Sequence, residues 1–467
     1  MFNLGELLSL AGLYVTFLNS DQIDRRLRRC TDLHARLGSR KNIRFRTISD
    51  GQPADHLRSV GQILELHASL KEKTKQLIRE MQAGQVEGDN ENWPRISCLI
   101  ADGIMSFAID VAGEFGIPSL LFRTSGAACF WVCLCVPKLV EAGELPFGEA
   151  TDLDHAINCI PGMEGQLRPR DLPSFCQVKD LNSHRLNFFL SEFERSSRAS
   201  GLIFNSFYDL EHTVLNQVST RFANVYAVGP LHSLVRSQNL DHSVTSGTSS
   251  LRKEDLSCID WLGRWGRGCV LYVSFGSHTQ INGDELLEFF HGLVNAGFPF
   301  LWVIRTDLVT GELGSVPKEL LEALQTRGCV VEWAPQEEVL AHPSVGGFFT
   351  HNGWNSTMES ICSGVPMLCW PSFADQPLNC RFVSHVWKIG LDMQRMCSRT
   401  MIERLVRELM AEKREELWES ATRMKERAWK SIQDGGSSIN DFHKLVDDIR
   451  SMTAPKKIEL SPFDNTD

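Results

Sequence analysis

Short apolar segments rich in β-branched residues alternate with longer segments of helical periodicity along most of the chain. This alternation is typical of a parallel β-sheet covered by helices, so it predicts an α/β fold. In the first half, strands are predicted at 13–18, 43–48, 96–102, 118–124, 201–207 and 225–230. In the second half, strands are predicted at 269–277, 298–305, 329–333, 346–350 and 366–370.

A polar segment at 237–255 separates the two sets of strands. It is rich in Ser and Thr and has no periodicity, which is typical of a linker. We therefore predict an N-terminal domain at 1–236 and a C-terminal domain at 256–467, each built on a doubly wound sheet. Two such sheets that face each other would hold a ligand in a cleft between the carboxyl ends of their strands.

The two ends of the chain are predicted to be helical. The apolar N-terminal stretch contains Glu6 and has no basic leader, so it reads as a helix that leads into a strand and not as a signal peptide. Near the other end, the amphipathic segment 401–451 is interrupted by Asp434-Gly435-Gly436. A final helix is expected from about Ser438, and we expect it to pack back on the N-terminal domain.

Size and charge narrow the class of protein. At 467 residues the chain is long enough for two domains. A net charge of −10 and a pI near 5.8 argue against nucleic acid or an anionic membrane surface as a partner, because either would favour a basic face. No apolar run approaches the roughly 20 residues that a membrane-spanning helix needs, so no span is expected.

Among the 14 cysteines there is one close cluster, formed by Cys129, Cys133 and Cys135. One interpretation is that these cysteines form a metal site or a redox pair. The other is that they serve as small apolar residues in a buried helix. No His or second Cys pair stands nearby to complete a zinc site, so packing is the favoured interpretation. Reduced thiols in a large α/β chain are typical of the cytosol, which is the expected location.

The segment from Trp333 to Gln376 carries the densest chemistry. Its strand at 346–350 runs directly into HNGWNSTMES, in which Asn355, Ser356 and Thr357 are expected to cap and open a helix. Free N–H groups and the helix dipole at such a helix start favour a diphosphate and require no metal. The next strand ends in PSFADQ, which places a carboxylate and an amide at the same edge, suited to sugar hydroxyls.

This segment resembles the signature box of the plant family 1 UDP-glycosyltransferases, with the landmarks W-x-P-Q, H-x-G-W-N-S, G-V-P and D-Q. The resemblance extends to FRT at Thr124, to FNSFYDLE, to VGPL and to LYVSFGS, and so covers nearly the whole chain. It implies the GT-B fold, inverting transfer and UDP-glucose as co-substrate, without a metal or another cofactor. Trp333 or His351 taken alone would more often be a structural residue. The presence of all these landmarks in one segment favours a nucleotide-sugar site.

The resemblance also implies a role for each matching residue. The residues expected to bind the UDP-sugar are Trp333 at the uracil, Gln336 and Glu359 at the ribose, Ser277, His351, Asn355 and Ser356 at the diphosphate, and Trp354, Asp375, Gln376 and Thr124 at the sugar. Ala334 and Gly353 are expected to bind the UDP-sugar as well. Gln376 in the last position of the box is associated with glucose. Asn352 stands where the family most often has Cys, and little effect is expected there.

On the acceptor side, the family pattern assigns Asp102 to orient a general-base His. That His belongs to a strand and loop for which this chain has no matching residues, since the chain starts within the helix that follows them. The earliest histidine, His34, does not match the position. We therefore expect a truncated or misassigned start of an active enzyme. The competing hypothesis is a catalytically impaired protein that binds UDP-sugars.

Three stretches, 46–56, 135–147 and 161–176, look most like the 7-deoxyloganetic acid glucosyltransferases within this family. The expected acceptor is therefore a small lipophilic iridoid or terpenoid, and a monomer is expected. A nicotinamide-dependent oxidoreductase is set aside because no G-x-G-x-x-G follows a strand. Asp152 and Asp154 form a D-x-D tripeptide like that of metal-dependent transferases, but solvated acidic residues are the favoured interpretation.

Overall fold

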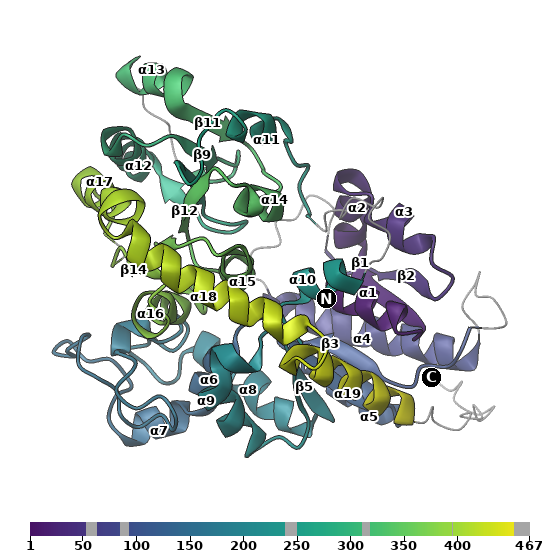
Figure 1. The fold of residues 1–467 in the computed structure, drawn as a ribbon. Coiled ribbons are helices and arrows are strands. Elements are labelled where there is room, and N and C mark those ends of the chain that lie inside the picture. Colours follow the sequence, from purple (N-terminus) through teal and green to yellow (C-terminus); the bar gives the residue numbers. More distant parts are fainter. Residues whose placement is uncertain (53–62, 85–92, 239–249, 311–317, 395, 453–467) are drawn as a thin grey trace.

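The computed structural model describes residues 1–52, 63–84, 93–238, 250–310, 318–394 and 396–452 (Figure 1). Most of the predicted linker, 239–249, lies outside this part of the chain, so the predicted domain boundary remains a prediction. The two halves of the chain have separate sheets, and within each sheet neighbouring strands are parallel.

The C-terminal half contains a six-stranded sheet. Its order is β11 (Gly328–Val331), β9 (Phe300–Val303), β7 (Val270–Ser274), β12 (Val345–Thr350), β13 (Met367–Cys369) and β14 (Gly390–Asp392). From β7 the chain runs outward through β9 to β11, then returns to β12 and runs the other way. The neighbours β7 and β12 are thus the topological switch point, where ligands of doubly wound sheets bind.

Helices cover both faces of this sheet (Figure 1). They are α11 (Ser257–Leu262), α12 (Gly283–Ala296), α13 (Lys318–Arg327), α14 (Gln336–Ala341), α15 (Trp354–Ser363), α16 (Gln376–Arg381), α17 (Arg399–Arg407) and α18 (Arg414–Ile432), with π-helical η4 (Phe382–Val386) and η5 (Glu408–Glu412). A short pair of strands, β8 (Ile281–Asn282) and β10 (Val309–Thr310), lies outside the main sheet. Neither this pair nor β14 was predicted from the sequence.

The N-terminal half has a four-stranded sheet in the order β3 (Leu99–Asp102), β4 (Ser119–Arg123), β5 (Gly201–Phe204) and β6 (Val225–Ala227). A separate pair is formed by β1 (Val15–Ser20) and β2 (Ile43–Ile48). Within the described ranges, β1 and β3 each have a hydrogen-bonded neighbour on one side only. Accordingly β3 is half-buried, whereas β4 and β5 are buried along their whole length. The expectation of a further strand remains a prediction.

The helices of this half alternate with its strands, as the pattern predicts. They are α1 (Phe2–Leu10), α2 (Asp21–Cys30), α3 (Leu33–Gly38), α4 (Ile63–Ala83), α5 (Phe107–Glu114), α6 (Ala127–Leu134), α7 (Val136–Glu141), α8 (His184–Arg195), α9 (Tyr208–Ser219) and α10 (Leu231–Gln238), with 3-10 turns η2 (Pro169–Asp171) and η3 (Ser196–Arg198). The apolar N-terminal stretch is the helix α1 followed by β1, as expected.

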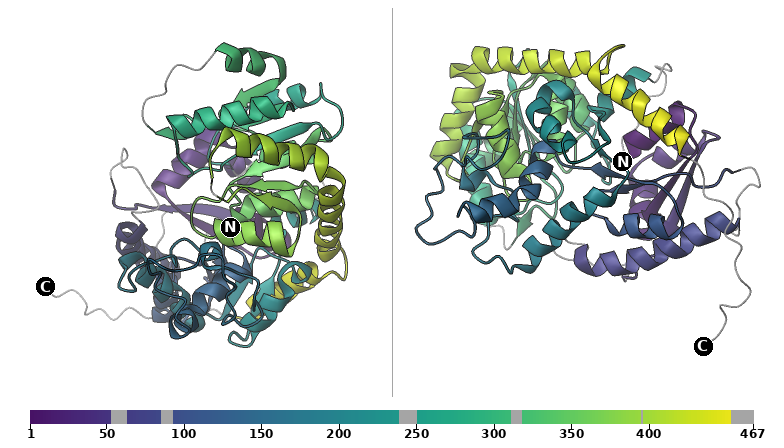
Figure 2. Two further views of the ribbon diagram at one scale, coloured as in Figure 1. Left: turned by 90° about the vertical axis from the view of Figure 1, so that its left-hand side faces the viewer. Right: turned by 90° about the horizontal axis from the view of Figure 1, so that it is seen from below.

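The last two helices connect the halves (Figure 2). The helix α18 packs against α15 in the C-terminal half and against α9 in the N-terminal half. After the break at 433–436, α19 (Ser437–Ser451) lies on β6, where the Tyr226 hydroxyl donates to Asp448 at 2.5 Å and the Ala227 N–H donates to Asp441 at 2.8 Å. The helix α19 is thereby fixed to the N-terminal sheet.

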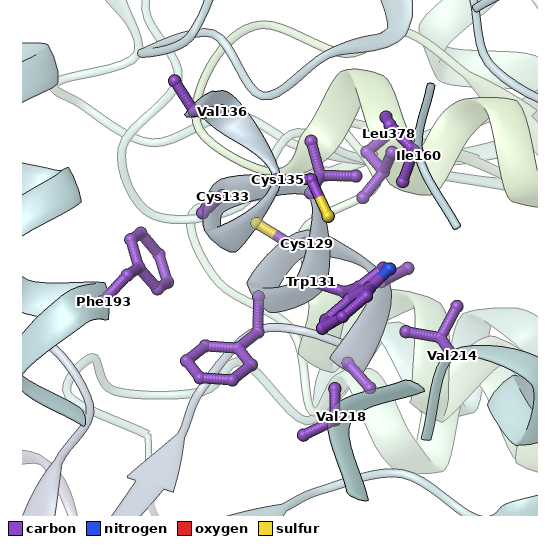
Figure 3. Packing of buried hydrophobic residues seen from close by; sticks show 14 of the residues in the cluster. Cys129, Trp131, Cys133, Cys135, Val136, Ile160, Phe193, Val214, Val218 and Leu378 are labelled. Carbon is purple, nitrogen blue, oxygen red and sulfur yellow. The ribbon is translucent and has the colours of Figure 1, made fainter. Parts of the chain in front are cut away.

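The cysteine cluster is part of the N-terminal core (Figure 3). Cys129 and Cys133 lie in α6 and Cys135 follows it, and all three are buried among aromatic and aliphatic side chains such as Trp131 and Phe193. Burial raises the pKa of the Cys133 thiol well above its ordinary value. The packing interpretation of this cluster is confirmed, and all 14 cysteines of the chain are free.

No helix in the described part of the chain is both long and apolar enough to cross a membrane.

Candidate functional site

The predicted donor residues lie in a row along one edge of the C-terminal sheet. Trp333 follows β11, Ser277 follows β7, His351 follows β12 and Gln376 follows β13. Because these strands are parallel neighbours, their carboxyl ends meet at the same edge. Strands stand about 4.8 Å apart, so the row from β11 to β13 spans roughly 20 Å. Residues far apart in the sequence thus form one elongated site.

The centre of the row is the start of α15. Gly353 is its N-cap residue, with an extended backbone, and the Thr357 N–H donates to the Gly353 carbonyl at 3.0 Å. The prediction that Asn355 to Thr357 cap the helix is wrong, because these residues already lie in the first turn. The N–H groups of that turn lack helical partners, and Asn355 and Ser277 are both exposed beside them. This arrangement suits an anion such as a diphosphate.

The imidazole of His351 fits between two glycines at this point. A Cβ atom built on Gly276 would lie 2.4 Å from its Nε2 atom, and one built on Gly353 would lie 2.6 Å away. Burial and, in second place, the charge of Arg305 lower the pKa of His351 to about 4. His351 is therefore neutral at neutral pH and can act on a phosphate through a hydrogen bond and not as a counter-charge.

Arg305, which follows β9, was not predicted as a site residue. Its buried guanidinium donates to the carbonyl oxygens of Gly276 and of Thr279, the latter at 2.6 Å, and its Nε atom pairs with Asp307 at 3.0 Å. These contacts hold the loop that presents Ser277. The signal was available in the sequence, since Arg305 is the last residue of the strand predicted at 298–305, at the same sheet edge as the other donor residues.

The predicted ribose residues form one hydrogen-bonded network. Gln336 donates through Nε2 to Ser356 at 2.9 Å and to Glu359 at 2.6 Å, and it accepts from the Tyr272 hydroxyl at 3.1 Å. Burial and the charge of Glu337 raise the pKa of Glu359 to about 8. The Gln336 amide is thus fixed in one orientation, and in the absence of a ligand Glu359 holds a proton at neutral pH.

This pKa predicts a pH dependence of stability. Because the pKa of Glu359 in the folded protein is above its value of 4.5 in the unfolded chain, its contribution to stability is present below pH 4.5. That contribution is lost as the pH rises through about 8. We expect Glu359→Gln to flatten the fall in unfolding free energy between these values. Denaturant titrations from pH 5 to 9 measure the unfolding free energy at each pH. Glu419→Gln, at an exposed position, is the control and should leave the pH dependence of the unfolding free energy unchanged. The same pH dependence in Glu359→Gln as in the unaltered protein would contradict the raised pKa of Glu359.

At the predicted uracil end, Trp333 packs with one part against the apolar core of this half, and the next residue, Ala334, is 3 % exposed. At the sugar end, the Oε1 atom of Gln376 accepts from the backbone N–H groups of Ser372 and Phe373, at 2.8 and 3.0 Å. This fixes the amide so that its NH₂ group remains for a ligand.

The neighbouring Asp375 completes the sugar end. Its carboxylate accepts from Asn379 at 2.9 Å, and the same Asn379 amide donates to the Asn352 carbonyl, also at 2.9 Å. Burial raises the pKa of Asp375 to about 6. Asn352 has a φ of 59°, a left-handed conformation that Asn adopts more readily than most residues. The sugar end is thereby tied to the turn that opens α15.

The side chain of Trp354 lies between the two halves of the chain, and its expected contact with the sugar remains a prediction. The indole is buried and its Nε1 atom donates at 2.9 Å to the Asn205 carbonyl in the N-terminal half. A Cβ atom on Gly126, also in that half, would lie 2.8 Å from the ring. The indole therefore joins the two halves, and the backbone N–H of Trp354 is the part that faces the helix start.

A second contact between the halves supports the sugar loop. The Ala374 N–H donates to the Ser174 hydroxyl and the Ser174 N–H donates to the Ala374 carbonyl, both at 2.8 Å. Arg381 adds a bond to the Gln166 carbonyl at 2.7 Å. The N-terminal half thus holds the loop that carries Asp375 and Gln376.

The candidate acceptor face lies at the carboxyl ends of β3 and β4. Asp102 ends β3, and its carboxylate accepts from the Ile104 N–H at 3.1 Å. Burial raises its pKa, while the Ile104 hydrogen bond and the charge of Arg123 oppose the rise. Thr124 directly follows β4 and is exposed. Because β3 and β4 are parallel neighbours, both predicted residues lie at the same edge of the N-terminal sheet.

The loop after Asp102 is held from three sides. Arg123 donates to the Gly103 carbonyl, and His67 is hydrogen-bonded through Nε2 to the Ile104 carbonyl at 2.7 Å. Glu192 of α8 accepts from the Ser106 N–H at 2.7 Å and from its hydroxyl at 2.8 Å. Sequence patterns alone do not pair such distant residues, so this support was not predicted.

The remaining candidates are structural. His34 pairs with Asp24 at 2.9 Å and lies against the Phe45 ring, away from any predicted site residue. Asp152 and Asp154 are exposed, and Asp154 pairs with Arg168 at 3.2 Å. The part of the chain that the structure describes contains no group of three or more His, Cys, Asp or Glu side chains arranged for a metal ion.

Comparisons with known proteins decide the family. A family model described as "UDP-glucoronosyl and UDP-glucosyl transferase" matches residues 232–426. A 7-deoxyloganetic acid glucosyltransferase from Catharanthus roseus is 44% identical over 97% of this chain and 94% of its own length. The chain belongs to this family. It is a UDP-glycosyltransferase, and the expected family resemblance is confirmed.

Further relatives and solved structures support membership of this family. A myricetin 3-O-rhamnoside 1,2-glucosyltransferase from Crocosmia x crocosmiiflora is 40% identical over 99% of this chain and 95% of its own length. The crystal structure of Medicago truncatula UGT71G1 with UDP-glucose covers 96% of this chain and 94% of its own, at 27% identity and a TM-score of 0.76. Os79 from O. sativa with UDP covers 96% of both chains, at 25% identity and a TM-score of 0.78. The predicted GT-B fold of this transferase is confirmed.

Proposed function

We propose that this glycosyltransferase transfers glucose from UDP-glucose to a hydroxyl or carboxyl group of a small lipophilic iridoid or related terpenoid. The observation that carries the proposal is the row of side chains along the C-terminal sheet, with the free start of α15 at its centre. Its two ends differ in chemistry: an aromatic platform at Trp333 suits a base, and the carboxylate and amide of Asp375 and Gln376 suit sugar hydroxyls.

In this proposal each part of the row has one task. Trp333 stacks on the uracil, while Gln336 and Glu359 take the ribose hydroxyls. Neutral His351, Ser277 and the α15 N–H groups hold the diphosphate and stabilise the charge that develops on it as the glycosidic bond breaks. Asp375 and Gln376 orient the glucose for attack from the opposite face, and Asp102 orients the base that takes the acceptor proton. No metal and no cofactor is proposed.

The acceptor class rests on relatives. Besides the 7-deoxyloganetic acid enzyme, a 7-deoxyloganetin glucosyltransferase from Gardenia jasminoides is 38% identical over 96% of this chain. A flavonoid rhamnoside is the acceptor in the name of another relative, so a phenolic glycoside is the second candidate class. The competing hypothesis of a catalytically impaired protein finds no support in these comparisons.

The test is an assay with UDP-glucose and three acceptors: 7-deoxyloganetic acid, 7-deoxyloganetin and myricetin 3-O-rhamnoside. The glucoside is detected by mass, in the presence of a chelator. We expect glucosylation of an iridoid at the highest kcat/KM. Preference for the flavonoid would overturn the acceptor class, and failure to bind UDP at all would overturn the donor site.

The expectation of a truncated start is tested in the same assay. A second protein carries, before Met1, the strand and G-H loop of a 7-deoxyloganetic acid glucosyltransferase. If both proteins bind UDP but only the extended one forms product, the base lies in the added segment. Equal turnover by both would contradict that expectation. Gel filtration and cell fractionation test the further proposals of a monomer and of a cytosolic location.

A further inference from the structure

The last residues of the segment between the two halves lie against Trp333. The Asp255 N–H donates to the Trp333 carbonyl at 2.8 Å. Three residues earlier, the Arg252 guanidinium lies over the Trp333 ring, 5.6 Å from its centroid. Trp333 is half-buried and packs in part against the core, so Arg252 lies over a ring that the core does not enclose completely.

The guanidinium of Arg252 is held by one ion pair, and one of its N–H groups lacks a hydrogen-bond partner in the described part of the chain. Its Nη2 atom pairs with Asp307 at 2.7 Å, and its side chain is 22% exposed. Its Nε atom is buried and has no hydrogen-bond partner within the described ranges. A buried N–H group without a partner is costly, so a ligand that supplies an acceptor here gains from the pairing.

The same anchor leads to the phosphate loop. Asp307 also pairs with Arg305 at 3.0 Å, and Arg305 holds the Gly276 and Thr279 carbonyls. Arg252, Asp307 and Arg305 therefore form one chain of contacts from the Trp333 platform to the loop of Ser277. The two ends of this chain of contacts are thus the proposed base platform and the loop of the proposed diphosphate site.

The spacing indicates how a base would fit. A ring stacked between an indole and a guanidinium needs two van der Waals contacts, together about 7 Å. The observed 5.6 Å is shorter, so Arg252 must move aside when a base stacks on Trp333. Its ion pair with Asp307 limits that movement, and its N–H groups then lie at the edge of the base. The planar fork of donors in Arg suits a carbonyl oxygen at that edge.

We propose that Arg252 recognises the base of the nucleotide donor by donating to an exocyclic carbonyl oxygen of uracil. The inference rests on the proposed donor site at Trp333. Adenine has no exocyclic oxygen, so Arg252 favours UDP over ADP. Arg252 acts on the bound donor before transfer, which places its effect on binding and not on the chemical step.

The experiment compares Arg252→Ala, Arg252→Lys and the control Lys253→Ala, which removes the same charge from the exposed neighbour. The dissociation constants of UDP and ADP are measured by calorimetry, and kcat and KM are measured with UDP-glucose. Loss of a charge-assisted hydrogen bond predicts that Arg252→Ala weakens UDP by roughly 10- to 100-fold. We expect ADP binding to change little, KM to rise with kcat nearly constant, and Arg252→Lys to restore only part of the loss.

Three outcomes would overturn the inference. If Arg252→Ala binds UDP as tightly as the unaltered protein, Arg252 makes no contact with the nucleotide. If Lys253→Ala weakens UDP binding equally, the effect of Arg252 is one of long-range charge and not of a specific contact. Equal weakening of UDP and ADP shows that Arg252 acts on the diphosphate and not on the base. If the unaltered protein fails to bind UDP, the proposed function itself has failed, which is a distinct result.

Discussion

Replacing Gly276 by Ala is expected to abolish useful transfer, with kcat/KM reduced by about 100-fold or more, the loss that a misplacement of about 1 Å can cause. The new Cβ atom would lie 2.4 Å from Nε2 of His351, far inside van der Waals contact. A Cβ atom built on Gly353 would lie 2.6 Å from the same Nε2 atom, so the turn at Gly353 is also close to the ring. Either the loop of Ser277 or the His351 ring must shift, and both belong to the proposed diphosphate site.

A second cost has to be separated from this one. Gly276 has a φ of +70°, and Ala in the left-handed region costs roughly 1–2 kcal/mol. Gly297, which ends α12 with a φ of +87°, provides the matched control, since a Cβ atom there meets nothing within 4 Å. Gly297→Ala should lose stability and keep its activity. If both variants lose kcat/KM equally, backbone strain and not the His351 contact explains the effect.

The second large effect is expected at Asp375. Asp375→Ala removes the carboxylate that is proposed to bind the glucose hydroxyls, and hydrogen bonds to a charged group contribute about 1.5–3 kcal/mol. We therefore expect kcat/KM for UDP-glucose to fall by roughly 10- to 100-fold. The affinity for UDP, which has no sugar, should stay nearly unchanged. Steady-state kinetics and UDP calorimetry measure the two quantities.

Two further variants sharpen this test. Asp375→Asn keeps an acceptor for the Asn379 amide and should lie between the parent and Asp375→Ala. Asp284→Ala removes an exposed carboxylate from the first turn of α12, outside the site, and should change neither quantity. An equal loss of UDP and UDP-glucose binding in Asp375→Ala would mean that the loop has collapsed and would contradict a contact with the sugar.

The positions of most strands and the place of the donor row could be predicted from the sequence because both depend on local patterns, whereas the order of the strands in each sheet was not predicted. A buried strand followed by polar residues places those residues at the sheet edge, whichever strand is its neighbour. For this reason the pattern predicted the site at His351 and the carboxylate and amide at Asp375 and Gln376, whereas Ser277 followed from the family resemblance, and β8, β10 and β14 were not predicted. The strands β8 and β10 have two residues each, too few for a periodic signal, and β14 reads Gly-Leu-Asp, with a single apolar side chain.

The parts that escaped prediction depend on contacts between distant segments. The bond from the Trp354 indole to the Asn205 carbonyl joins the two halves, and no local pattern indicates it. The same holds for Glu192, which supports the loop at Ser106 from another helix. Arg252 lies in a segment that reads as a linker, where its chemistry has no local signal. The predicted roles of the individual donor residues remain predictions until they are tested by substitution.

Binding of UDP in the presence of a chelator is the most direct test of the donor site. Calorimetry on the unaltered protein, on Gly276→Ala and on Gly297→Ala compares the two positions under the same conditions. We predict one UDP per chain for the unaltered protein and for Gly297→Ala, and loss of binding in Gly276→Ala. Absence of UDP binding to the unaltered protein, or equal binding to all three, would contradict the site along this sheet edge.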